Sequence, residues 1–178
     1  MMPFPLCLQA ATPADIRVVL VTADLAFRLT IPAGYTLPPV DPKSTELVRS
    51  WDIKTPDGGT IRIEVEPRGG KPGDLEAVID ARFTRDRAET PGARVSAEGT
   101  RKNLFGETAY VFRRTAPDAP DRLYAIFAAK RTVTTIWTDR SAAMREKDPD
   151  ETAFWRVALS YAFITDRVAP SRRKDGKG

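Results

Sequence analysis

Two short segments of the sequence combine residue types that could bind an anion or a metal ion. Residues 69–73 read Gly-Gly-Lys-Pro-Gly before a predicted helix, where free backbone amides can hold an anion. Their spacing is not that of a phosphate-binding loop, and no Ser or Thr follows the lysine, so a flexible connection is the favoured interpretation. Residues 148–151 read Asp-Pro-Asp-Glu, but no later acid completes a calcium-binding loop. Asp150 and Glu151 are better explained as acids at the positive end of a helix.

The composition excludes most other catalytic chemistry. The 178 residues include no histidine, which excludes Ser-His-Asp triads, histidine-activated cysteine nucleophiles and histidine-ligated zinc. The single cysteine, Cys7, excludes intrachain disulfides, and no basic neighbour in the sequence would activate its thiol. We therefore predict neither a cofactor nor a metal site. A carboxylate-dependent hydrolase stays open as an alternative, because the separation of two acids is a property of the fold.

Four arginines on or beside predicted strands are the candidate partner-binding residues, on what we expect to be an exposed polar surface. They are Arg62, Arg113, Arg114 and Arg131. Such residues could form a basic strip for an acidic partner. Acidic residues are interspersed among them, so a solvated strand face is the favoured alternative. The three tryptophans are interpreted as core residues rather than as walls of a ligand groove: Trp51, Trp137 and Trp155.

Alternation of apolar and polar residues, which is typical of strands, dominates the sequence. Residues 25–31 alternate in this way, and the apolar run at 16–21 is expected to pair beside them. Residues 55–59 read Thr-Pro-Asp-Gly-Gly, a turn sequence that predicts a hairpin between 46–54 and 61–66. Further strands are predicted at 94–98, 108–114, 122–129 and 132–138.

Helical spacing of apolar residues marks two other segments. The first begins after Asp74, a suitable N-cap, and carries its apolar stripe on Leu75, Val78, Ile79 and Phe83. The second begins near Ser141, resumes at Asp150 and ends in a short extended piece at 161–164. Residues 123–129 are apolar on both faces, which predicts a central strand. The order of strands, helix, strands and helix predicts an α+β domain with a mostly antiparallel sheet packed by helices.

The two ends of the chain differ from its middle. We divide the chain into an apolar N-terminal stub at 1–15, a single domain at 16–165 and a basic tail at 166–178. The tail holds five basic and two acidic residues, a net +3 of the chain's +4. The nearly neutral remainder argues against nucleic-acid binding. The stub is either a signal-peptide remnant or a frayed terminus. No stretch reaches the roughly 18 apolar residues of a membrane-spanning helix.

Three motifs carry a resemblance to a known family. Residues 27–35, Phe-Arg-Leu-Thr-Ile-Pro-Ala-Gly-Tyr, resemble the opening signature of the PsbP-like superfamily, with Tyr35 where Trp is commonest. Residues 104–110 resemble its mid-chain glycine before a strand, and residues 154–163 resemble its closing helix and aromatic strand. The resemblance implies an α/β/α sandwich with a central antiparallel sheet. The superfamily includes photosystem II extrinsic proteins, a Ran-binding import factor, bacterial envelope lipoproteins and effector chaperones, and it implies no catalytic motif.

These observations lead to an ordered set of hypotheses about function. The first is a non-enzymatic protein-binding or accessory domain that is exported or envelope-associated, in the periplasm or secreted. The alternative is a cytoplasmic chaperone or adaptor that shields a hydrophobic segment of a partner protein. A carboxylate-dependent hydrolase comes third. In the first two hypotheses the partner is another protein, whose identity the sequence leaves open, as it does the oligomeric state.

Overall fold

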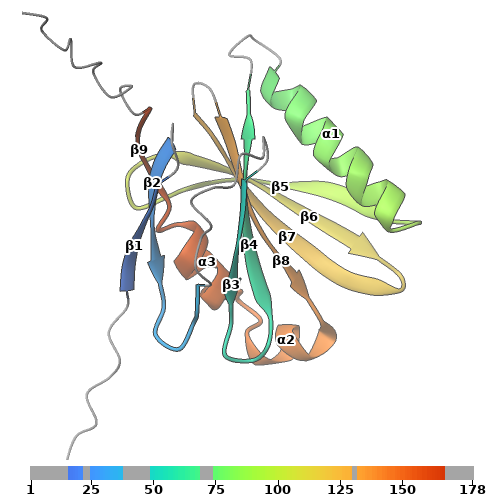
Figure 1. The fold of residues 1–178 in the computed structure, drawn as a ribbon. Helices are drawn as coiled ribbons and strands as arrows, with labels where there is room; N and C mark the ends of the chain where they lie inside the picture. Colours follow the sequence, from blue (N-terminus) through green and yellow to red (C-terminus); the bar gives the residue numbers. More distant parts are fainter. Residues whose placement is uncertain (1–15, 22–24, 38–48, 69–73, 130–131, 167–178) are drawn as a thin grey trace, which may run out of the picture.

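A computed structural model describes residues 16–21, 25–37, 49–68, 74–129 and 132–166, and Figure 1 shows them arranged around two antiparallel sheets. The strands are β1 (Ile16–Val21), β2 (Leu25–Ile31), β3 (Arg49–Lys54), β4 (Thr60–Pro67), β5 (Arg94–Lys102), β6 (Thr108–Ala116), β7 (Ala119–Ala128), β8 (Thr132–Arg140) and β9 (Ala162–Asp166). The helices are α1 (Asp74–Glu89), α2 (Ala142–Lys147) and α3 (Thr152–Ala158). None of these helices is long and apolar enough to cross a membrane.

The larger sheet has six strands in the order β3-β4-β8-β7-β6-β5. The predicted turn at 55–59 joins β3 to β4, with the Thr55 amide donating to the Gly59 carbonyl at 3.1 Å. Gly58 adopts φ 85°, a conformation that favours glycine. The alternation predicted for β4 is confirmed, because Ile61, Ile63 and Val65 are all buried.

Both faces of the larger sheet are covered, as Figure 1 shows, with α1 on one face and α3 with the smaller sheet on the other. Five consecutive β7 residues, from Leu123 to Phe127, are therefore buried. On the α1 face, Tyr124 and Ile126 pack in one cluster with Phe83 of α1. On the opposite face, Leu123, Ala125 and Phe127 belong to a second cluster that includes residues of β2 and α3. This confirms the central strand and the antiparallel sheet packed by helices on both faces.

The smaller sheet has the order β1-β2-β9 and brings the two ends of the described chain together. The predicted pairing of 16–21 with 25–31 is confirmed, with Ile16 opposite Ile31 and Leu20 opposite Phe27. The extended piece predicted at 161–164 becomes β9, which pairs with β2. The Thr30 amide donates to Ser160 Oγ at 2.8 Å, which ties β2 to the end of α3. The first hairpin thus joins β9 in a sheet separate from the larger one, and strand periodicity does not encode this separation.

Charged contacts help α1 to pack on its face of the larger sheet. The Arg82 guanidinium binds Glu64 and lies 3.1 Å from Glu66, both on β4. Asp86 accepts from Tyr124 Oη and from Arg122, the latter at 3.1 Å. Because buried ions need partners, this network holds the helix against the sheet in addition to its apolar stripe.

Candidate functional site

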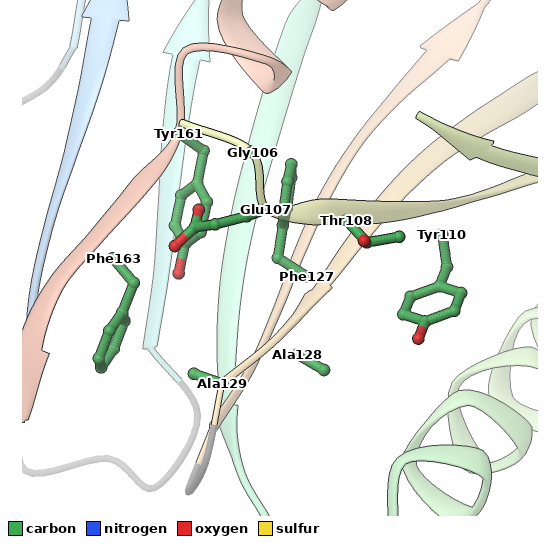
Figure 2. Close-up of a pocket in the computed structure, with 9 residues that line it drawn as sticks. All are labelled: Gly106, Glu107, Thr108, Tyr110, Phe127, Ala128, Ala129, Tyr161 and Phe163. Carbon is green, nitrogen blue, oxygen red and sulfur yellow. The ribbon is translucent and has the colours of Figure 1, made fainter. Parts of the chain in front are cut away.

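A cavity of about 600 Å³ lies where β9 meets the adjacent ends of β6 and β7 (Figure 2). This volume is in the range of about 300–1,000 Å³ typical of ligand pockets. In Figure 2, Tyr161 and Phe163 stand on one side, Tyr110 on the other, and the Glu107 side chain extends toward Tyr161. The lining residues are Gly106, Glu107, Thr108, Tyr110, Phe127, Ala128, Ala129, Tyr161 and Phe163.

The turn between β5 and β6, residues 103–107, forms one wall of this cavity and is organised by Asn103. The Asn103 Oδ1 accepts from the amides of Phe105 at 2.9 Å and Glu107 at 2.8 Å. Its Nδ2 donates to Glu107 Oε2 and to the Tyr161 carbonyl, both at 2.7 Å. Asn103 is buried, and no other asparagine occurs in the sequence. Because two donors face Oδ1 and two acceptors face Nδ2, the amide fits in one orientation only.

Gly106 completes this turn with φ 82°, in the left-handed region. An added Cβ there would meet no atom within 4 Å, so backbone conformation rather than space explains the glycine. The Gly106 amide donates to the Asn103 carbonyl at 3.2 Å, and the Leu104 amide donates to the Leu159 carbonyl at 3.1 Å. The turn is therefore fixed both internally and against the end of α3.

Tyr161 lines one side of the cavity and is 2% exposed. Its ring centroid lies 4.7 Å from that of Phe127, and its hydroxyl shares a hydrogen bond of 2.9 Å with Thr134 Oγ1. Burial raises the pKa of the Tyr161 hydroxyl well above its usual range, and the nearby Glu107 charge acts in the same direction. Tyr161 thus stays protonated at physiological pH and cannot serve as a general base there.

Two large apolar side chains extend from the turn into solvent. Leu104 is 78% exposed and Phe105 is 48% exposed. The Arg28 guanidinium lies 4.0 Å from the Phe105 ring centroid, a cation–π contact that holds the ring beside β2. A second hollow of about 110 Å³ lies between the turn and β2, lined in part by Leu104, Phe105 and Ser160. The turn at 103–107 therefore contributes to both hollows, with Gly106 and Glu107 lining the larger and Leu104 and Phe105 lining the smaller.

Searches of protein-family models and of curated proteins gave no match. The solution structure of cyanobacterial PsbP (CyanoP) from Synechocystis sp. PCC 6803 is similar to this chain over 92% of this chain and 100% of that one, with a TM-score of 0.57. The fold is PsbP-like. The two sequences are 14% identical, so the likeness concerns the fold alone. The fold implied by the motifs at 27–35, 104–110 and 154–163 is confirmed.

The PsbP-like fold places two of the four candidate arginines on the α1 face of the larger sheet. Arg62 donates to both carboxylate oxygens of Asp52, at 2.6 and 2.9 Å. Arg114 is only 3% exposed and donates to Thr90 at 3.0 Å and to the Pro120 carbonyl at 2.8 Å. Arg114 thus differs from the expectation of an exposed residue, because its guanidinium ties the end of α1 to the β6–β7 hairpin.

Arg113 extends from the opposite face of the same PsbP-like sheet. Its guanidinium lies 2.5 Å from Glu98 and 2.6 Å from Glu151. Arg131 and the glycine-rich run at 69–73 lie outside the described residues. The structure does not bring the described arginines together, and a role for these residues in partner binding stays a prediction.

The acids at 148–151 have roles that differ from the predicted ones. Asp148, rather than Asp150 or Glu151, accepts from the first amides of α3, those of Thr152 at 2.9 Å and Ala153 at 3.0 Å. Glu151 has φ 60° and is buried. Its carboxylate accepts from Arg113 at 2.6 Å, from Arg140 at 2.8 Å and from Trp155 Nε1 at 3.1 Å. Glu151 therefore neutralises the buried Arg140 and the half-buried Arg113, a role that only the tertiary fold reveals.

We next searched the described part of the chain for a metal site or a catalytic pair of acids. No three His, Cys, Asp or Glu residues gather there in a way that would hold a metal ion. A small hollow of about 60 Å³ is lined by Asp57 and Asp148 among others, but Asp148 caps α3. A hydrogen bond from Thr55 lowers the pKa of Asp57, which is the wrong direction for a general acid. The three tryptophans are buried, which confirms their place in the core.

The central residues of the cavity were not predicted from the sequence as a site. Asn103 and Glu107 share the turn at 103–107, whereas Tyr161 lies 58 residues after Asn103, and no sequence motif joins the turn to Tyr161. One local signal existed: a lone asparagine precedes Leu104-Phe105-Gly106, two apolar residues and a glycine between two strands. Apolar residues at a turn are unusual enough to indicate a surface with a function.

Proposed function

We propose that this PsbP-like domain is a non-enzymatic accessory protein that binds another protein through the turn at 103–107 and the adjoining cavity. One observation carries the proposal. Among the residues whose side-chain exposure the structure describes, three of the four exposed large hydrophobic side chains lie on this turn or line the cavity, and the fourth lies on β9. They are Leu104, Phe105, Tyr110 and Ile164.

The rigidity of the turn supports a binding role. Exposed apolar side chains cost solubility, so a cluster of them indicates an interaction surface. Asn103 fixes the backbone that carries Leu104 and Phe105 through its side-chain hydrogen bonds. A partner that packs on side chains already held in place loses less conformational entropy on binding. The turn is thus suited to supply apolar anchors to a protein interface.

A catalytic role has little support among the described residues. Glu107 is the acid that lines the large cavity, and the tyrosine hydroxyl beside it is held protonated. Burial raises the pKa of Asp86, but that carboxylate faces Arg122 and Tyr124 beneath α1 rather than a cavity. Two acids with opposed pKa shifts around one substrate-sized space would be needed for acid–base hydrolysis.

We further propose that the protein is exported or envelope-associated, on the basis of the apolar sequence at 1–14. Mass spectrometry of the N-terminus of the native protein tests this point. A chain that begins near residue 12–15 is the expected result. An intact Met1 in a cytosolic fraction would contradict export and favour the second candidate function, a cytoplasmic chaperone or adaptor for a hydrophobic segment. The exposure of Leu104 and Phe105 favours this second candidate as well.

Native co-purification from the source cells tests the protein-binding function. The full chain is compared with the double variant Leu104→Ser/Phe105→Ser and with Glu76→Ser/Asp80→Ser, which changes two exposed residues of α1. We expect a stoichiometric protein partner with the full chain and with the α1 variant, and its loss with the turn variant. Equal recovery of the partner with all three proteins would refute this site, and a chain that purifies alone would refute the function.

A further inference from the structure

Glu107 lacks the partner that other enclosed glutamates have. Among the described glutamates that are not exposed, Glu64, Glu66 and Glu151 each form a salt bridge with an arginine. Glu107 is half-buried and accepts one hydrogen bond, from Asn103 Nδ2, without a salt bridge to any described residue. A carboxylate in such surroundings is stabilised when a cation approaches it.

Two described basic side chains outside the cavity lining donate to residues that line it, Thr108 and Ala129. Lys102 Nζ donates to Thr108 Oγ1 at 2.6 Å, and Arg68 Nη1 donates to the Ala129 carbonyl at 3.2 Å. Neither forms a salt bridge with Glu107. The negative charge therefore stays available to a cation from outside the described residues.

The cavity walls suit the remainder of a basic side chain. Aromatic rings from three strands and from the residue before β9 surround the space, and two alanines leave it open at the end of β7 (Figure 2). Lysine and arginine carry long apolar stems that pack on such walls, and aromatic faces attract their charged ends. The aromatic residues are Tyr110, Phe127, Tyr161 and Phe163.

We infer that the cavity binds a lysine or arginine side chain of the partner protein, with the apolar stem against the aromatic walls and the cationic end at the Glu107 carboxylate. This inference rests on the proposed protein-binding function. It also names the chemistry of the bound segment: a basic residue for the cavity, next to apolar residues that meet Leu104 and Phe105.

Small probes test the charge requirement without knowledge of the partner. The ¹⁵N-labelled full chain is titrated at constant ionic strength with n-pentylammonium, with n-pentylguanidinium and with 1-pentanol. The readouts are the side-chain amide of Asn103, unique in type in the sequence, and the backbone amides of Gly106, Glu107 and Phe163. We expect saturable shifts with at least one cation, and binding about tenfold weaker for pentanol, as expected from loss of one charge-assisted contact.

Variants then assign the charge to Glu107. Glu107→Gln keeps the side-chain shape and an acceptor for Asn103, and we expect it to weaken cation binding about tenfold while leaving pentanol binding unchanged. Glu89→Gln makes the same change of net charge at an exposed position on α1 and should bind like the unaltered chain. Lys130→Gln/Arg131→Gln should also bind like the unaltered chain.

Three results would overturn the inference: equal affinity for the cations and pentanol, insensitivity to Glu107→Gln, or cation binding that emerges only after Lys130 and Arg131 are replaced. The last result would show that the chain's own cations fill the cavity. These failures are distinct from failure of the proposed function. If the partner is still lost with the Leu104→Ser/Phe105→Ser variant, the proposed protein-binding function stands. Only the claim that the partner inserts a basic residue into the cavity is then refuted.

Discussion

Asn103 gives the sharpest test of how the turn is held. Replacement by alanine removes the side-chain hydrogen bonds to the amides of Phe105 and Glu107, to the Glu107 carboxylate and to the Tyr161 carbonyl. Water can reach the amides of Phe105 and Glu107 near the surface, so loss of each of these two hydrogen bonds costs about 0.5–1 kcal/mol. The Tyr161 carbonyl lies in buried surroundings and costs about 1–3 kcal/mol when left without a donor. We expect Asn103→Ala to lower the free energy of unfolding by about 2–5 kcal/mol.

Asn103→Asp separates hydrogen bonding from packing. Aspartate fills the same space and still accepts from the two amides, but it replaces the Nδ2 donor with an oxygen. That oxygen would face the Tyr161 carbonyl and the Glu107 carboxylate. At pH 7 we therefore expect Asn103→Asp to destabilise the domain at least as much as Asn103→Ala.

Urea unfolding followed by fluorescence of the three buried tryptophans measures both changes. Leu104→Ala, at an exposed neighbouring position, is the matched control and should stay within about 0.5 kcal/mol of the unaltered chain. Hydrogen exchange at the amides of Phe105 and Glu107 should accelerate in Asn103→Ala alone. A loss below about 1 kcal/mol in both Asn103 variants would refute the view that this side chain organises the turn.

Three other perturbations test the fold around the site. Glu151→Ala leaves the buried Arg140 without its carboxylate partner and removes one of the two partners of the half-buried Arg113, so we expect a loss of about 3–5 kcal/mol in urea unfolding at pH 7. The hydrogen bond from Arg62 lowers the pKa of Asp52 below its ordinary 3.8, so its stabilisation is present above that value and is lost as the pH falls through the folded-state pKa. Asp52→Asn should therefore make the urea midpoint fall less steeply with acid; an unchanged slope would contradict this coupling. Gly106→Ala forces alanine into φ 82° without a clash and should cost about 1 kcal/mol, whereas a stabilising effect would contradict the left-handed turn.

Much of the fold follows from local patterns in the sequence. Phe27, Leu29 and Ile31 alternate with polar residues because β2 buries one face, and these three side chains are indeed buried. Apolar residues on both faces of β7 predict its central position for the same reason. The division into two sheets is a tertiary choice: it depends on β9 closing onto β2, which lies more than a hundred residues earlier in the chain.

The site was less accessible to sequence reasoning, because burial decides what a polar residue does. Arg114 looks like a strand-surface residue, yet it is buried beneath the end of α1. Glu151 looks like a helix-start acid, yet its carboxylate accepts from Arg113 and Arg140. Asn103 has no periodic pattern around it, and its importance lies in the four groups that the fold brings within its reach.

Site-specific cross-linking in the source cells tests the central claim most directly. A photoreactive phenylalanine analogue replaces Phe105 in one full-length chain and Glu76, exposed on α1, in another. We expect irradiation to join position 105 to a single protein partner in good yield, with the cross-link on a segment that holds apolar residues and a lysine or arginine, and position 76 to give no such product. No cross-link from position 105, or the same products from both positions, would contradict the claim that the turn at 103–107 and its cavity form a protein-binding surface.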